Sequence, residues 1–312
     1  MVQFEEYAVV GEVSRGSFGQ VWRCTDPTGR EVAVKICRLD AVEVGRQEVL
    51  HADRIFDDVA HGALCHVLRP LRCFEHEGRV CMVFPLLLHS LYREFTVGRP
   101  QPAARLASIA YQLLLGLAFL HNRAVIHADL KLSNVMVEED GDRPVVHLID
   151  LGNTITNEEI LLYHNDTNVA SLGYRSPEVL FGLGYPTHAI DMWALGVILL
   201  ELATRKRLFP ARTADGAVAQ VQKLLGPVPA SIYGPSPMFA THRSGHGRPP
   251  SVASVEGTVA AALRSKRVPP SFVHFVAGML DYNPATRTHV NKALLHPFLT
   301  GASPLDACLP RP

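Results

Sequence analysis

The sequence has 312 residues and carries 30 basic and 30 acidic side chains, so its formal net charge is zero. Hydrophobic residues make up 47% and charged residues 19%, which excludes a disordered chain and is typical of a globular protein with room for two lobes. The balanced charge argues against broad binding to nucleic acid or to an anionic membrane.

The sequence has the character of an intracellular protein, cytoplasmic or nuclear. The first residues lack a basic segment, so we expect no secretory signal. No unbroken apolar run reaches the roughly 18 residues that span a bilayer, because Gln112 interrupts one candidate and Glu201 ends another. The six cysteines include no C-x-x-C pair, so we expect reduced thiols and no zinc site.

The first part of the chain predicts strands and one helix. Val, aromatic residues and period-two alternation are typical of strands. The expected strands span residues 7–14, 20–25, 30–37, 67–73 and 79–84. Asp26-Pro27-Thr28-Gly29 is a turn signal and predicts a hairpin between the second and third of them. Residues 41–55 contain few helix breakers and predict the helix.

After about residue 88 the pattern changes to helical spacing. The expected helices span residues 102–121, 187–204, 216–225, 271–280 and 291–295. The second of these is apolar on nearly all sides, so we expect it to be buried. Residues 226–270 are rich in Pro, Gly and Ser and predict an irregular insert. The fold class is therefore α+β, with a small β-rich lobe followed by a larger helical lobe.

A glycine pair lies between the first two expected strands, in the run Ser14-Arg15-Gly16-Ser17-Phe18-Gly19-Gln20-Val21. Such a hairpin can close over phosphates and offer backbone N–H donors. Taken alone, a pair of glycines is more often a plain β-turn. Gly11 and Gly16 have the G-x-x-x-x-G spacing of a P-loop. A P-loop is nevertheless excluded, because it requires Lys and then Ser or Thr after the second glycine, and Ser17-Phe18 stands there.

Lys35 ends the apolar run Val32-Ala33-Val34 on the next expected strand. From there its ammonium can bind the α- and β-phosphates of a nucleotide. A buried lysine needs a carboxylate partner. The following helix offers two, Glu48 and Glu43, and the spacing favours Glu48 without excluding Glu43.

The strongest chemical signal is His127-Ala128-Asp129-Leu130-Lys131-Leu132-Ser133-Asn134. Asp129 can accept the proton of a substrate hydroxyl, and Lys131 can balance charge on a phosphoryl group. Asn134 can ligate Mg²⁺ through its amide oxygen. Asp150, in Asp150-Leu151-Gly152 after an apolar strand, is a second candidate magnesium ligand.

These motifs resemble the eukaryotic protein kinase family over nearly the whole chain. They are similar to its glycine-rich loop, nucleotide-anchoring strand, catalytic loop and metal-binding Asp-Phe-Gly motif. Ser176-Pro177-Glu178 resembles the Ala-Pro-Glu motif, and by that analogy Glu178 pairs with Arg287. Tyr174 to Leu180 and Ala189 to Gly196 look like the CMGC group, closest to the DYRK and HIPK kinases, and His-Ala-Asp is the HIPK form.

The resemblance implies a bilobal protein kinase domain over residues 1–300, with a small lobe to 87, a large lobe from 88 and a tail at 301–312. It implies a Ser/Thr kinase with Asp129 and Lys131 as catalytic residues, Asn134 and Asp150 on Mg²⁺, ATP as the phosphoryl donor and protein substrates as partners. We expect a monomer that binds neither nucleic acid nor membrane. The implied nucleotide-binding residues are Val13, Ser14, Arg15, Gly16, Ser17, Phe18, Gly19, Val21, Ala33, Lys35, Glu48, Phe84, Leu87 and Met136.

Several positions depart from the family pattern. Ser14 replaces the first glycine of the loop, and Leu151 replaces the Phe of the Asp-Phe-Gly motif. Asn168 stands where DYRK kinases carry a tyrosine, and Leu172-Gly173 replaces the usual Arg and aromatic pair. Ala128 replaces an arginine that can gather an activation-segment phosphate. A nucleotide-binding pseudokinase scaffold is therefore kept as the alternative function.

Overall fold

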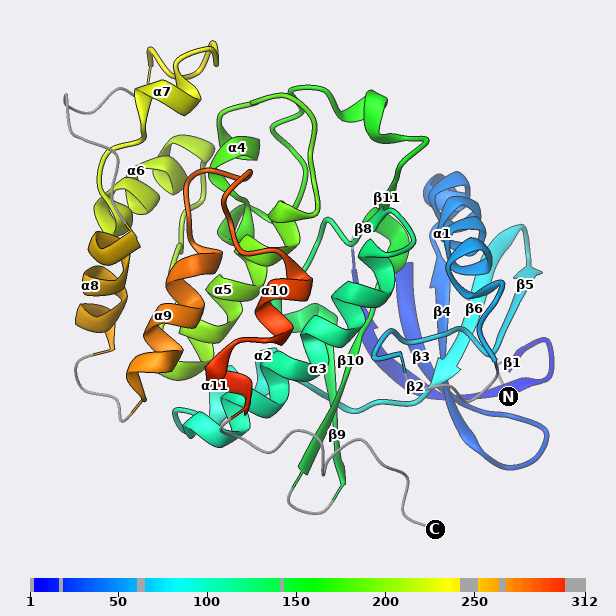
Figure 1. Cartoon of the computed structure of the whole chain (residues 1–312). Helices are drawn as coiled ribbons and strands as arrows, with labels where there is room; N and C mark the ends of the chain where they lie inside the picture. Colours follow the sequence, from blue (N-terminus) through cyan, green and yellow to red (C-terminus); the bar gives the residue numbers. More distant parts are fainter. Residues whose placement is uncertain are drawn as a thin grey trace.

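A six-stranded antiparallel sheet with one long helix forms the first part of the molecule (Figure 1). The structure is a computed structural model that describes residues 3–16, 19–60, 65–140, 143–241, 252–263 and 268–300. The strand order is β1-β2-β3-β4-β6-β5. The strands are β1 (Gln3–Phe4), β2 (Tyr7–Arg15), β3 (Gly19–Thr25), β4 (Glu31–Cys37), β5 (Arg72–His76) and β6 (Arg79–Pro85).

The helix α1 (Val42–Phe56) packs closely against this sheet. Gly45 makes the approach possible, because a Cβ there would lie 3.1 Å from the Cβ of Val80 and 3.2 Å from the Cβ of Cys37. Both distances are tighter than ordinary side-chain contacts. The glycine therefore brings Glu48, almost one turn later, toward β4.

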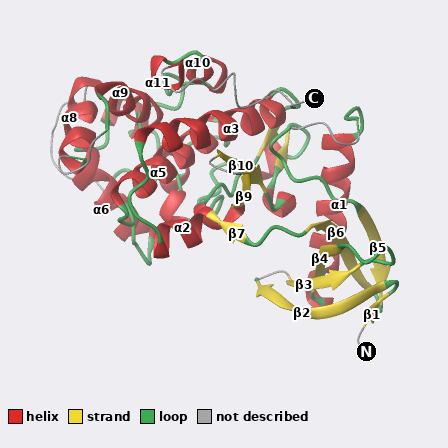
Figure 2. Ribbon diagram, turned by 90° about the horizontal axis from the view of Figure 1, so that it is seen from below, coloured by secondary structure: helices red, strands yellow, loops and turns green. Residues whose placement is uncertain are grey.

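The second part is helical, and Figure 2 shows its helices gathered apart from the six-stranded sheet. Its helices are α2 (Leu91–Val97), α3 (Ala103–His121), α4 (Pro177–Leu180), α5 (Ala189–Thr204), α6 (Ala214–Leu225), α7 (Ala230–Tyr233), α8 (Val252–Ala262), α9 (Pro270–Met279), α10 (Val290–Leu294) and α11 (Pro297–Thr300). Two small antiparallel sheets, β10-β9-β7 and β11-β8, lie with them. Their strands are β7 (His89–Ser90), β8 (Val125–Ile126), β9 (Val135–Asp140), β10 (Arg143–Leu148) and β11 (Ile155–Thr156).

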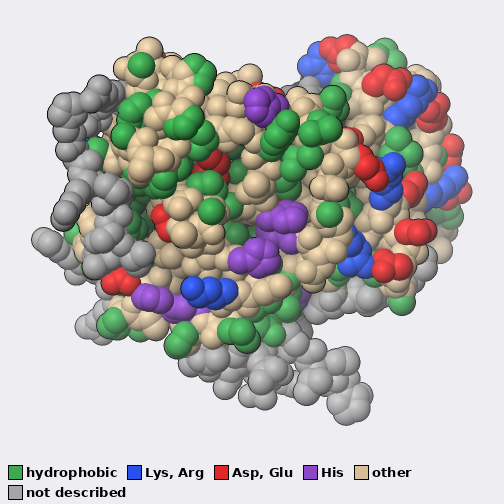
Figure 3. Space-filling view, turned by 45° about the horizontal axis from the view of Figure 1, so that its top comes forward, with side chains coloured by type: hydrophobic (Ala, Val, Ile, Leu, Met, Phe, Trp, Pro, Cys, Tyr) green, Lys and Arg blue, Asp and Glu red, His purple; other side chains and the backbone are tan. Residues whose placement is uncertain are grey.

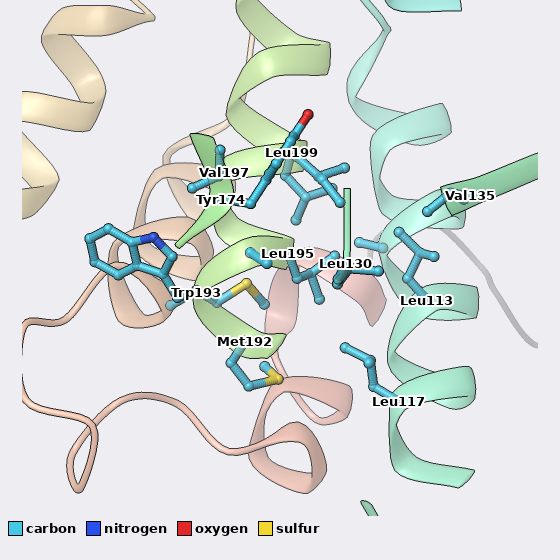
Figure 4. Close-up of a cluster of buried hydrophobic side chains, with 14 of the residues drawn as sticks. Leu113, Leu117, Leu130, Val135, Tyr174, Met192, Trp193, Leu195, Val197 and Leu199 are labelled. Carbon is cyan, nitrogen blue, oxygen red and sulfur yellow. The ribbon is translucent and has the colours of Figure 1, made fainter. Parts of the chain in front are cut away.

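The core of the helical lobe forms around α3 and α5. Every residue of α5 after Ala189 is buried, as its uniformly apolar sequence predicts. Figure 4 shows Leu113 and Leu117 of α3 facing Leu195 of α5, with Leu130 between them. Leu130 belongs to the segment 127–134 that resembles the catalytic loop of the kinase family, and this segment is called the catalytic loop below. Burying a leucine side chain stabilises a fold by about 1.5–3 kcal/mol. The catalytic loop is therefore anchored in the main core.

Helix α3 is long and apolar enough to cross a membrane by length and composition, with a mean hydropathy of 1.6. The prediction from the sequence concerns unbroken apolar runs, and in α3 the run is interrupted by Gln112. However, 61% of that window is buried inside the protein. Gln112 donates to the carbonyl of Pro144 (2.8 Å) and accepts from the N–H of Val146 (3.0 Å). The helix is thus packed against β10 as a core helix.

Charged side chains are unevenly spread over the face shown in Figure 3. Acidic and basic groups crowd the lobe of the six-stranded sheet, at the right, and few lie on this face of the helical lobe. The lobe of the six-stranded sheet carries exposed ion pairs such as Arg72 with Glu5 (2.8 Å) and Arg46 with Glu75 (3.1 Å). Such pairs contribute about 0–1 kcal/mol each. On this face the two signs are mixed, as the zero net charge suggests.

Most of the predicted elements are confirmed within a few residues. The predicted hairpin joins β3 and β4, and Asp26 accepts bonds from the backbone N–H groups of Thr28 and Arg30 across its turn. The predicted strand at residues 67–73 is wrong. Pro70 lacks an N–H, and Leu68 donates its own to the carbonyl of Leu148, so β5 begins only at Arg72.

The prediction of an irregular insert at residues 226–270 is wrong for residues 252–262, whereas residues 226–241 contain only turns, loop and the short helix α7, as predicted. Val252–Ala262 forms α8. Val255, Val259 and Leu263 recur every four residues and are buried in the core. A helix-spaced apolar set therefore outweighs the composition of the flanking Pro- and Gly-rich segments. Residues 242–251 and 264–267 and the predicted tail at 301–312 lie outside the described residues.

A buried ion pair joins two distant parts of the helical lobe, as the family resemblance predicts. Arg287 donates two bonds to Glu178, at 2.6 and 2.8 Å, and two more to the carbonyls of Asp281 and Ala189. The Arg287 side chain is 0% exposed and the Glu178 side chain 4%. The chain from Asp150 to Glu178, between the two motifs named above, is called the activation segment. The ion pair thus fixes the end of this segment on the helical lobe.

Replacing Arg287 with Met should lower the free energy of unfolding by about 3–5 kcal/mol, because Glu178 would stay buried without its cation. Urea denaturation measures this change. As a control, Arg54→Met removes an exposed pair with Glu158 and should change stability by about 1 kcal/mol or less. Equal losses in the two variants would contradict the prediction.

Candidate active site

The glycine hairpin connects β2 and β3 at the edge of the site. The Gly16 N–H donates to the carbonyl of Gly19 at 2.9 Å and closes the turn. A Cβ at Gly19 would lie 2.3 Å from the carbonyl oxygen of Ile36, so only glycine fits there. Ser14 is paired with Val21 in the ladder. Arg15 bonds Glu12 at 3.1 Å, and Ser17 and Phe18 lie outside the described residues.

Lys35 joins three elements through its ammonium. It donates to both carboxylate oxygens of Glu48, at 2.6 and 2.7 Å, and to Oδ1 of Asp150 at 2.8 Å. Burial lowers the pKa of Lys35, but the two carboxylates outweigh burial and raise it above its usual value. Burial raises the pKa of Asp150, and the nearby Lys35 ammonium overcomes that effect and lowers it. One cation therefore lies between two carboxylates.

Glu48, and not Glu43, is the partner of Lys35. Glu48 is 4% exposed and faces β4 from α1. Glu43 is bonded to Arg46 at 2.7 Å, and its side chain is 83% exposed. The two glutamates differ by five residues, which places them on different faces of a helix with 3.6 residues per turn.

Asp129 lies at the centre of the catalytic loop, between β8 and β9, and is 5% exposed. Its Oδ2 accepts from Lys131 at 2.6 Å and from the amide of Asn134 at 3.3 Å. Its Oδ1 accepts from the backbone N–H of Ser171 at 3.1 Å and from the Ser171 hydroxyl at 2.7 Å. The carboxylate is thus within reach of both a cation and a hydroxyl.

Two further residues at Asp129 are not predicted from the sequence: Ser171 and Asn153, whose amide lies 3.5 Å from Asp129. Ser171 also accepts a bond from Lys131 at 3.1 Å. The sequence places Ser171 five residues before Ser176-Pro177-Glu178, which locates it in the activation segment only. Nothing in the local sequence shows that the chain folds back onto Asp129 across 42 residues.

The polar groups on this side of the site suit a magnesium ion. Asn134 directs its amide nitrogen to the carbonyl of Asp129 at 3.0 Å, which leaves its amide oxygen as the group able to ligate a metal. Asp150 adds a carboxylate from a left-handed residue, φ +67°. No cluster of three or more His, Cys, Asp or Glu able to hold a metal occurs in the described parts of the chain. Mg²⁺ commonly uses only one or two protein carboxylates together with phosphates and water.

Asp191 on α5 supports the catalytic loop from below. Its carboxylate accepts the backbone N–H groups of His127 at 2.9 Å and Ala128 at 3.0 Å. His121 lies 2.9 Å away through Nε2. Burial raises the pKa of Asp191, but the hydrogen bond and electrostatic attraction of His121 outweigh burial, so the pKa lies below its usual value. These bonds hold Ala128 in a left-handed conformation, φ +61°, directly before Asp129.

The residues expected around adenine come from both lobes. Val21 on β3 is the ladder partner of Lys35, and Ala33 on β4 is the partner of Phe84 on β6. Leu87 lies between β6 and β7. Strand β7 pairs with β9, where Met136 lies opposite Ser90, so the connection carries Leu87 toward Met136. Val13 on β2 is 44% exposed.

Comparisons with known proteins agree with this geometry. The protein kinase domain family matches residues 7–299. Cell division control protein 2 homolog 3 of Trypanosoma brucei brucei is 30% identical over 96% of this chain and 94% of its own length. Dual specificity protein kinase CLK1 of Mus musculus is 28% identical over 94% of this chain, and DYRK-family kinase pom1 of Schizosaccharomyces pombe is 30% identical over 95%.

The chain spans 65% of the length of the mouse kinase and 28% of the fission yeast kinase, less than two thirds of each. The relatives also confirm the predicted likeness to CMGC kinases. With a family match that extends from β2 to α11, the chain belongs to the protein kinase domain family and has its bilobal fold.

Proposed function

We propose that this protein transfers the γ-phosphoryl group of ATP to Ser or Thr hydroxyls of protein substrates. The observation that carries the proposal is the environment of Asp129, with Lys131 at 2.6 Å and a hydroxyl, that of Ser171, at 2.7 Å. Phosphoryl transfer chiefly requires positioning of the reactants and neutralisation of charge. This constellation offers both.

Lys35 would hold the α- and β-phosphates, with Glu48 fixing its position. The glycine hairpin would cover the phosphates, and Val21, Ala33 and Met136 would enclose adenine. Phe84 would lie at the back of that site, and the N–H of Leu87 would bind the adenine edge, since Pro85 has none. Asn134 and Asp150 would hold Mg²⁺, which neutralises phosphate charge when bound.

Asp129 would accept the proton of the substrate hydroxyl as its oxygen attacks the γ-phosphorus. The bond from that phosphorus to the β–γ bridging oxygen breaks, and ADP leaves with the electron pair. Lys131 would stabilise the charge on the phosphoryl oxygens during transfer. Its place two residues after Asp129 resembles that of Ser/Thr kinases and supports these acceptors over tyrosine.

The activation segment is held by apolar contacts at the position where other kinases bind a phosphate. Ala128 is 2% exposed and belongs to a cluster whose other buried members are Ile126, Ile155, Val169, Val179 and Ile190. Val169 comes from the activation segment itself. This packing supports activity with little dependence on phosphorylation of that segment.

An intracellular location and a monomeric state belong to the same proposal. The five cysteines within the described residues are free thiols, which suits a reducing compartment. Burial raises the pKa of Cys24 and Cys73 to about 11 and of Cys81 to about 12. The mixed surface charge supports protein substrates in place of nucleic acid as partners.

Asp129→Asn should lower phosphate transfer to a generic basic protein by about 10²–10⁴-fold, because the amide cannot accept the proton. Radiolabelled phosphate incorporation measures the rate, and calorimetry should show unchanged ATP binding. The matched control is Asp58→Asn, which alters an exposed aspartate paired with Arg123 and should keep wild-type activity. If wild type transfers no more phosphate than Asp129→Asn, the pseudokinase scaffold replaces the proposed function.

Glu48→Gln should reduce kcat/KM for ATP by about tenfold or more, which corresponds to about 1.4 kcal/mol, because Lys35 loses an ionic partner. Glu43→Gln is the matched control on the same helix. Its kcat/KM for ATP should stay close to that of wild type, since the Glu43 side chain bonds Arg46 and not Lys35. Steady-state kinetics with varied ATP measures both. A similar loss in the two variants would contradict the assignment of Glu48.

Phosphatase treatment of protein made in bacteria should leave most of its activity, because the activation segment is held by the Ala128 cluster and not by a phosphate. Mass spectrometry establishes that phosphate has been removed before the rate is compared. A fall of more than about tenfold would show that a phosphate supplies over 1.4 kcal/mol of barrier lowering and would refute this point.

A further inference from the structure

A polar face of α1 lies against the chain that follows the metal-binding loop. Gln47 and His51 are four residues apart and share this face, and Glu48 precedes His51 by almost one turn. His51 is 3% exposed. In Figure 1 the segment between β11 and α4 extends to the side of the molecule that carries α1. His51 has no part in the proposed phosphoryl transfer itself.

The two ring nitrogens of His51 each face an oxygen of that segment. Nδ1 lies 2.7 Å from the hydroxyl of Thr154, which also donates to the carbonyl of Leu151 at 2.8 Å. Nε2 lies 3.0 Å from Oε1 of Glu159. One side chain thus contacts the chain at two points, four and nine residues after Asp150.

Glu159 is itself fixed at both carboxylate oxygens. Oε2 accepts the N–H of Thr156 at 3.0 Å and its hydroxyl at 2.8 Å, and Oε1 also accepts from the amide of Gln47. Burial raises the pKa of Glu159, but the bonds from Thr156 and His51 outweigh burial and lower it. A charged carboxylate therefore stands on the activation segment opposite α1.

We propose that His51 is a positioning residue that ties α1 to the activation segment through Thr154 and Glu159, and so keeps Glu48 on Lys35. The proposal rests on the proposed kinase function. Gly152 lies close to Glu48, because a Cβ at this position would be only 3.3 Å from Oε2 of Glu48. A shift of α1 away from the loop would break the His51 bonds and the Lys35 ion pair together.

Glu159 provides the negative charge in this link permanently. A phosphorylated side chain on an activation segment can order that segment by binding a basic group. Here a glutamate and a histidine make a charge-assisted bond between the same two elements without modification. The link therefore gives a second physical reason for activity that does not depend on phosphate.

Neighbouring glutamates provide a matched test. Glu159→Ala removes the carboxylate that meets His51, whereas Glu158→Ala removes an exposed one that pairs with Arg54. We expect Glu159→Ala to lower kcat/KM for ATP about tenfold with an unchanged KM for the protein substrate, and Glu158→Ala to stay within about twofold. A merely structural role would lower the amount of folded enzyme and leave the KM for ATP unchanged.

The contact itself is tested with His51→Leu and the double variant His51→Leu/Glu159→Ala. Residues that act through one contact are not additive, so the double variant should be no more than about twofold worse than the worse single variant. Full multiplication of the two losses would overturn the proposal. So would ATP kinetics of Glu159→Ala that match those of Glu158→Ala.

Hydrogen exchange of the α1 amides provides a readout that needs no catalysis. Exchange across Val42–Phe56 should rise about threefold or more in Glu159→Ala and His51→Leu, and not in Glu158→Ala. Unchanged exchange in the first two variants would refute the link. If the variants show this exchange pattern but the wild-type protein transfers no phosphate, the proposed function is refuted and the link between α1 and the activation segment remains supported.

Discussion

The ammonium of Lys35 is the contact on which the geometry of the site depends. It comes from β4 and binds carboxylates from α1 and from the loop after β10, so three separate elements meet at one nitrogen. One cation between two carboxylates leaves a formal charge of −1. Buried charge of this kind is costly unless it is paired. The excess suits a divalent cation bound with nucleotide phosphates, so the same contact shapes both the fold and the site.

Two kinds of support surround this centre. On the helical side, Asp191 binds the backbone of the catalytic loop and Leu130 packs into the main core. On the sheet side, Gly45 lets α1 approach closely enough for Glu48 to reach Lys35. Asp191 and Leu130 are buried in the helical lobe, whereas α1 contacts the chain after Asp150 along one face. We therefore infer that movement of α1 is the easier way to change activity.

The sequence predicts those parts of the site whose residues are close together in the chain. Asp129, Lys131 and Asn134 lie within six residues, so their spacing alone indicates their chemistry, and the structure places them together. Ser171 could not be found in the same way, because its contact with Asp129 depends on tertiary packing. The choice between Glu48 and Glu43 depends on which face of α1 packs toward β4, which is again a matter of tertiary packing. The strand predicted at 67–73 failed because Pro70 and the bond from Leu68 to Leu148 override local preference.

The burial of Asp191 has a consequence for how such a protein can diversify. Its carboxylate is 1% exposed and serves three partners at once, so a change on α5 that disturbs it alters folding and the catalytic loop together. Leu161 and Leu162 on the activation segment are 70% and 80% exposed. Substitutions there can change surface contacts without a comparable effect on folding or on the catalytic loop. Evolutionary novelty in this scaffold is therefore free to accumulate on its outer loops while the reaction itself is preserved by the stability of the core.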